Sequence, residues 1–138
     1  KPSFGEFVIM FKLYTDAATM NNSGNSSCGI LIVHDNQQYQ YKLKLEAKNN
    51  HEAEFEACLL GFKQLEKLVK SDDIVVYYTD SKIVHESLEK QYAKHFQDYV
   101  DKILSEQSKY SLVINNWIED TKNEGAHNLA TQALHLFY

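Results

Sequence analysis

The chain contains no arginine, so all fourteen of its strongly basic side chains are lysines. Nineteen acidic residues outnumber them and give a formal net charge of −5. Bidentate recognition of phosphate by guanidinium groups is therefore excluded. Non-specific coating of DNA is disfavoured as well, because that mode of binding neutralises several phosphates at once.

Cysteine is scarce, and long apolar stretches are missing. The two cysteines, Cys28 and Cys58, lie in apolar sequence and lack the spacing of a metal-binding or redox pair. We expect them to be buried, reduced thiols in a cytoplasmic protein. No apolar run approaches the roughly 20 residues that a membrane-spanning helix needs, so we expect no membrane partner.

The length of 138 residues is typical of one domain. There is one proline, and no linker, internal repeat or low-complexity tract offers a boundary, so residues 1–138 are expected to form a single domain. Hydrophobic residues make up 43% and charged residues 24% of the chain, which is close to the average of globular proteins and argues against disorder.

Hydrophobic patterning predicts three strands in the first third of the chain. Residues 7–15 form an almost unbroken apolar run, typical of a central strand buried on both faces, and Asp16 ends it. Residues 28–34 and 39–45 are the next two strands, joined by a turn at residues 35–36. The short connections predict an antiparallel meander.

The apolar spacing then becomes helical. Residues 52–69 form an amphipathic helix that Asn49 can cap. Two more strands and three more helices are expected, and Ser81 can cap the first of these helices. The strands cover residues 74–78 and 112–116, and the helices cover residues 82–89, 95–107 and 123–137. The order βββαβααβα predicts an α/β fold, in which a mixed five-stranded sheet carries helices on both faces.

Three acids stand where this topology would bring them together. Asp16 and Asp80 follow the first and fourth strands, and Glu54 lies near the start of the long helix. If the two strands are parallel neighbours, the three carboxylates meet at one edge of the sheet. Each acid alone is most simply a helix-capping or strand-ending group. Together they would repel one another without a cation, and oxygen ligands suit Mg²⁺ or Mn²⁺.

Four motifs, in order and on the expected elements, resemble those of the type 1 ribonuclease H family. They are YTDAA at residues 14–18, NNHEAEFEA at 49–57, VYYTDS at 76–81 and NEGAHNLA at 123–130. The second is most similar to the compact branch of that family. The resemblance covers nearly the whole chain and implies the ribonuclease H-like fold.

The resemblance implies a metal-dependent endoribonuclease that cleaves the RNA strand of RNA–DNA hybrids. Asp16, Glu54 and Asp80 would be its catalytic, metal-binding carboxylates. Two divalent ions, Mg²⁺ or Mn²⁺, and an attacking water would serve this phosphodiester hydrolysis. The matching positions that would contact the substrate are Ala17, Asn50, His51 and Ser81.

The chain departs from the family pattern at His127, which takes the place of a fourth carboxylate. As a fourth metal ligand, a neutral imidazole suits softer ions better than Mg²⁺, so activity would be weak or would depend on Mn²⁺. The alternative is a solvent-facing histidine with no role. The acidic net charge and His51, which replaces an asparagine, keep a second interpretation open. This is a catalytically silent ribonuclease H-like module that binds nucleic acid or a protein partner.

Two further expectations concern side chains outside the motifs. Trp117 follows the fifth strand and is expected in the core rather than at a base-stacking surface. Four lysines alternate with acids along the middle of the chain and are expected to form a solvated face; they are Lys82, Lys90, Lys94 and Lys102.

Overall fold

A computed structural model describes residues 9–138, so the beginning of the first predicted strand lies outside the described residues. The predicted order βββαβααβα is confirmed. The elements are β1 (Met10–Thr19), β2 (Ser26–His34), β3 (Gln37–Leu45), α2 (Asn50–Leu65), β4 (Ile74–Thr79), α3 (Lys82–Lys90), α4 (Gln97–Gln107), β5 (Leu112–Trp117), the short 3₁₀ helix η1 (Asp120–Lys122) and α5 (Glu124–Phe137).

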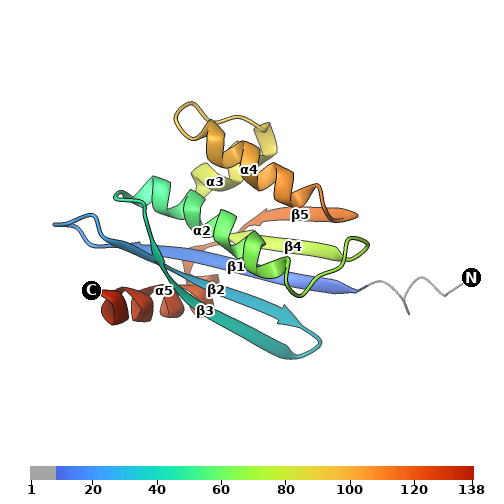
Figure 1. The fold of residues 1–138 in the computed structure, drawn as a ribbon, viewed down its shortest axis with the longest axis horizontal. Helices are drawn as coiled ribbons and strands as arrows, with labels where there is room; N and C mark the ends of the chain where they lie inside the picture. Colours follow the sequence, from blue (N-terminus) through green and yellow to red (C-terminus); the bar gives the residue numbers. More distant parts are fainter. Residues whose placement is uncertain (1–8) are drawn as a thin grey trace, which may run out of the picture.

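The five strands form one mixed sheet in the order β3-β2-β1-β4-β5, with β1 at its centre. The strands β1, β2 and β3 pair antiparallel as the predicted meander, whereas β4 pairs parallel with both β1 and β5. Figure 1 shows α2, α3 and α4 on one side of the sheet and α5 on the other. The prediction of an α/β fold with helices on both faces is therefore confirmed.

The strand β1 is longer than predicted, and Asp16 lies inside it rather than at its end. Parallel pairing with β4 stops at Tyr14 and Tyr78, but antiparallel pairing with β2 continues as far as Thr19. The polar continuation stays extended because its ladder of backbone hydrogen bonds with β2 continues. Asp16 and Asp80 each follow the last parallel pair by two residues, so both emerge at the same sheet edge.

The predicted burial of β1 on both faces holds only in part. Met10 and Lys12 are exposed, whereas Phe11 and Leu13, which alternate with them, are buried. The buried face packs under α2, but the helix on the other face, α5, lies mainly over β2. The amino-terminal half of β1 is therefore central in the sheet without being enclosed.

Local capping explains where the helices begin. The side chain of Asn49 accepts a hydrogen bond from the backbone N–H of Glu52 at 2.9 Å, and that of Ser81 accepts one from Val84 at 3.3 Å. Both caps were predicted. The helix α2 ends at Leu65, before the predicted residue 69. After Leu65 the backbone forms turns in which an N–H donates to the carbonyl oxygen three residues earlier, as Leu68 does to Leu65.

The core lies between the sheet and α2, with α4 packed behind that helix. Its largest fully buried side chains include Phe55 and Phe62 of α2 and Tyr77 of β4. Cys28 and Cys58 are buried free thiols, as expected. Within residues 9–138, none of the helices has the length and hydrophobicity that crossing a bilayer would require.

Gly29 of β2 allows α5 to pack directly on the sheet. A Cβ atom at Gly29 would lie 2.3 Å from the carbonyl oxygen of Ala126 and 2.5 Å from the backbone nitrogen of Ala130. These backbone atoms cannot move unless the helix shifts. We therefore expect Gly29→Ala to lower the free energy of unfolding by about 2–3 kcal/mol, measured by urea denaturation.

Gly125→Ala is the matched control for this prediction. A Cβ atom there would meet only the end of the flexible Leu31 side chain, at 2.8 Å. We expect a change of less than about 1 kcal/mol, because a side-chain terminus can move aside. Equal losses in the two variants would show that the helix is not seated on Gly29.

Candidate active site

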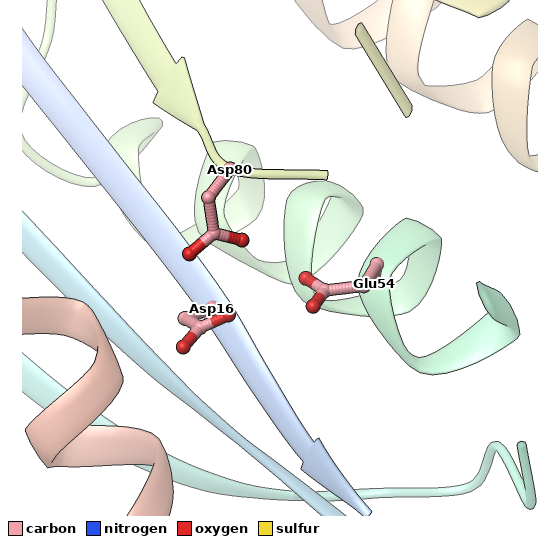
Figure 2. Close-up of side chains that lie close together, drawn as sticks. All are labelled: Asp16, Glu54 and Asp80. Atoms are coloured by element: carbon pink, nitrogen blue, oxygen red, sulfur yellow. The ribbon is translucent and has the colours of Figure 1, made fainter. Parts of the chain in front are cut away.

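Asp16, Glu54 and Asp80 come together from three elements. Figure 2 shows their side chains pointing toward one another, from β1, from α2 and from the segment that follows β4. One carboxylate oxygen from each residue can be chosen so that all three lie within 4.8 Å of one another. The predicted convergence is confirmed. We call these three residues the acidic cluster.

Close packing of α2 on β1 brings Glu54 within reach of the two aspartates. Gly61 lies two helical turns after Glu54 on α2, and a Cβ atom there would come within 2.6 Å of the Thr15 side chain. A larger residue at this position would push the helix away from the strand. The absence of a side chain at Gly61 therefore helps to place the Glu54 carboxylate beside Asp16.

Burial makes the acidic cluster hold protons more tightly than free carboxyl groups do. Burial, followed by the charges of Asp16 and Asp80, raises the pKa of Glu54 well above its ordinary value. Burial and the charge of Asp80 raise the pKa of Asp16 to about 6, although a hydrogen bond with His127 opposes that rise. Burial also raises the pKa of Asp80, which a hydrogen bond from Asn123 opposes.

The donor set of the acidic cluster fits a hard divalent cation. Oε1 of Glu54 is buried and has no hydrogen-bond partner among the described residues. A buried carboxylate oxygen without a partner is costly, and a cation would satisfy it. All the converging donor atoms are carboxylate oxygens, which are the ligands that Mg²⁺ and Mn²⁺ prefer.

His127 stands at the rim of the acidic cluster. Its Nδ1 lies 3.0 Å from Oδ2 of Asp16, and its side chain is 60% exposed. The geometry joins His127 to one carboxylate but does not include it among the three converging groups. Its predicted role as a fourth metal ligand stays a prediction.

Asn123 is part of the site, although no role was predicted for it. It is buried, and its Nδ2 donates to the Thr15 carbonyl oxygen at 2.9 Å and to Oδ2 of Asp80 at 3.2 Å. It therefore ties the end of the parallel pair β1 and β4 to the start of α5. The sequence feature that could have pointed to Asn123 is its position as the first residue of the NEGAHNLA motif.

A cleft of about 820 Å³ opens beside the acidic cluster. Glu54 and Asp80 line it together with all four residues predicted to contact a substrate, namely Ala17, Asn50, His51 and Ser81. Their position on the cleft is an observation, and their contact with a substrate stays a prediction.

The four lysines expected to form a solvated face are exposed; they are Lys82, Lys90, Lys94 and Lys102. The first three of them also line the cleft. The expectation for Trp117 was wrong, because this residue is 38% exposed rather than part of the core. It ends β5, which is an edge strand of the sheet that the described residues form.

Comparison with known proteins gives consistent sequence matches. A family model described as RNase H matches residues 10–135. A protein of Enterococcus faecalis named "Putative hydrolase EbsB" is 34% identical over 131 residues, which span 94% of this chain and 97% of that protein.

Solved structures share the fold at low sequence identity. The RNase H1 of the halophilic archaeon Halobacterium salinarum superposes with a TM-score of 0.83 at 18% identity, over 91% of this chain and 98% of that one. LC11-RNase H1, solved in complex with an RNA/DNA hybrid, gives a TM-score of 0.75 at 20% identity, over 88% and 94% of the two chains. These likenesses confirm the ribonuclease H-like fold.

The raised pKa values predict how the stability of the metal-free protein depends on pH. The pKa of Asp16 rises from 3.8 to about 6, so its stabilising contribution is complete at low pH and is lost as pH rises through about 6. Glu54 extends this loss to higher pH. We expect Asp16→Asn to raise the free energy of unfolding at about pH 8 by about 1–3 kcal/mol.

Chemical denaturation in a chelator, at about pH 5 and about pH 8, measures this effect. Asp72→Asn, an exposed aspartate beyond the opposite end of β4, is the control and should leave the profile unchanged. An Asp16→Asn variant that is no more stable than the wild type at the higher pH would contradict the prediction.

Proposed function

The chain belongs to the RNase H family, and we propose that it is a metal-dependent endoribonuclease that cleaves the RNA strand of RNA–DNA hybrids. The observation that carries this proposal is the convergence of Asp16, Glu54 and Asp80, with one buried Glu54 oxygen that has no hydrogen-bond partner within residues 9–138. The RNA/DNA hybrid bound by LC11-RNase H1 supports this choice of substrate.

In this proposal the acidic cluster holds two divalent ions, Mg²⁺ or Mn²⁺, while substrate is bound. Such ions lower the pKa of an attacking water and offset the charge on the leaving oxygen. The protein's own contribution is to hold the carboxylates in place against their repulsion. Asn123 supports this role through its hydrogen bonds to Asp80 and to the backbone of β1.

The cleft offers suitable chemistry for a nucleic acid. Asn50 and His51 present polar groups at the start of α2, and Lys82, Lys90 and Lys94 contribute positive charge. A hybrid would be recognised by groove shape, phosphates and 2′-hydroxyls more than by base sequence. Because these three lysines are the cleft's lysines and the chain as a whole is acidic, we expect hybrid binding to be weak and sensitive to salt.

A catalytically silent module that binds nucleic acid or a protein partner is the second candidate. The observation that favours it is His127, an exposed imidazole at the position of the family's fourth carboxylate. The acidic cluster weighs against it, because three clustered carboxylates destabilise a fold that makes no use of them.

The direct test is incubation with a labelled RNA–DNA hybrid in Mg²⁺ and, separately, in Mn²⁺. We expect RNA fragments with 5′-phosphate and 3′-hydroxyl ends. Divalent ions should also raise the melting temperature, since they bind the folded site and not the separated acids. Asp16→Asn should lose cleavage and most of the melting shift, whereas Asp72→Asn should keep both.

The combination of results separates the two candidates. A wild-type chain that binds hybrid but neither cuts it nor responds to millimolar Mn²⁺ would favour the silent module. A chain whose melting temperature rises with divalent ions and that cuts the hybrid would exclude the silent module.

His127 provides a second test, because its replacement can improve the enzyme. His127→Asp restores an oxygen ligand, so we expect Mg²⁺-supported cleavage to rise roughly tenfold relative to Mn²⁺-supported cleavage. His127→Ala should give no such gain, and neither should His135→Asp, an exposed position on the same helix. If the Asp and Ala variants at position 127 match the wild type with both ions, His127 is not a ligand.

A further inference from the structure

Trp117, the last residue of β5, contacts the turn that presents Asp80. Its indole Nε1–H donates a hydrogen bond to the Asp80 carbonyl oxygen at 3.0 Å. In the sheet, Trp117 lies opposite Thr79, and the N–H of Ile118 donates to the Thr79 carbonyl oxygen at 2.9 Å. The end of β5 therefore holds the backbone from which the Asp80 side chain projects.

Core packing does not account for this arrangement. Trp117 is 38% exposed, so it buries less apolar surface than an enclosed tryptophan would. Its one polar atom is directed at the backbone of a residue in the acidic cluster. The hydrogen bond fixes a peptide group next to the site, which a phenylalanine of similar shape could not do.

The face of the same indole ring interacts with the ammonium group of Lys82, which lines the cleft. Nζ of Lys82 lies 5.2 Å from the ring centroid, within the range of a cation–π interaction. Lys82 is the first residue of α3 and lines the cleft beside Asp80. The ring restrains a long, flexible side chain, so its ammonium group stays near the cleft and spends less time in open solvent.

We propose that Trp117 is a positioning residue that acts through two neighbours. Its N–H sets the orientation of the Asp80 backbone, and the backbone in turn directs the Asp80 carboxylate toward the metal site. Its ring holds the Lys82 ammonium where a phosphate of the substrate enters the cleft. This inference rests on the proposed function and adds two roles that Asp16 and Glu54 cannot supply.

The remaining contacts of the turn make the effect separable from folding. The Thr79 hydroxyl accepts from the N–H of Ser81 at 3.0 Å, and the Ser81 side chain caps α3. The start of α3 is therefore fixed without the indole. Asn123 holds the Asp80 carboxylate at 3.2 Å, so Trp117 is the side chain that restrains the carbonyl of the same residue.

The experiment uses variants that remove one contact at a time. Trp117→Phe keeps a ring face and loses the N–H, whereas Trp117→Leu loses both. Lys82→Gln removes the charge only, and Lys102→Gln, an exposed lysine of α4, is its control. Ser111→Ala is the control for the hydrogen bond, because that hydroxyl donates to backbone carbonyls at the other end of β4.

Two binding measurements are made on each variant, neither of which requires cleavage. The first is Mn²⁺ affinity, from melting temperature against ion concentration. The second is the salt dependence of hybrid binding in a chelator. We expect Trp117→Phe to weaken Mn²⁺ binding about fivefold, as for the loss of one hydrogen bond, and to keep the salt slope. Lys82→Gln should keep Mn²⁺ affinity and lower the salt slope by about one.

The remaining variants complete the pattern. Trp117→Leu should show both defects, and the two controls should show neither. Because the chain has a single tryptophan, its one indole N–H resonance gives a test that needs no variant. That resonance should shift when Mg²⁺ is added to the wild type, and the shift should vanish in Asp80→Asn.

The outcomes are distinguishable from failure of the proposed nuclease. A wild type that binds Mn²⁺ but cuts no hybrid would refute the nuclease, and the Mn²⁺ titration of Trp117→Phe would still decide the role of Trp117. The positioning role would be overturned if Trp117→Phe kept its Mn²⁺ affinity and the wild-type indole resonance did not shift when Mg²⁺ was added. An unchanged salt slope in both Trp117→Leu and Lys82→Gln would overturn the role assigned to the ring.

Discussion

Repulsion among three carboxylates, one buried and two partly buried, is the constraint around which the site is organised, at the place where β1 and β4 stop pairing. The fold prevents the groups from moving apart. Strand pairing holds Asp16, the close approach of α2 holds Glu54, and the Asn123 side chain holds the Asp80 carboxylate. With separation prevented, burial and then repulsion raise the pKa values of Asp16 and Glu54. One Glu54 oxygen is also left without a hydrogen-bond partner among the described residues. Protonation relieves the repulsion at low pH, and a bound cation would relieve it where the carboxylates are ionised.

The same repulsion bears on substrate binding. A phosphate backbone that approaches the cleft meets an acidic chain and the negatively charged cluster, with Lys82, Lys90 and Lys94 as the opposing charges on the cleft. A cation held by the cluster would reduce the repulsion toward phosphate as well as that among the carboxylates. Metal and nucleic acid should therefore strengthen each other's binding, which is a reciprocal coupling of two sites.

Local sequence patterns predicted the elements and the meeting of Asp16, Glu54 and Asp80, because strand ends and helix caps depend on neighbouring residues. They did not predict what depends on distant partners. The strand β1 passes through Asp16 because β2 pairs with it, and Asn123 bonds to the backbone of a residue 108 positions away. The exposure of Trp117 follows from the edge position of β5, which strand order sets and periodicity does not show.

The helix α5 connects the packing of the sheet to the geometry of the acids. Asn123 and His127 are four residues apart at its start, so they lie on one face, and they reach Asp80 and Asp16 respectively. Both contacts require the helix to lie close to the sheet. The residue that permits this approach is Gly29, which is also the register partner of Asp16 in β2. A missing side chain beside one carboxylate thus allows a single helix to restrain two of the three.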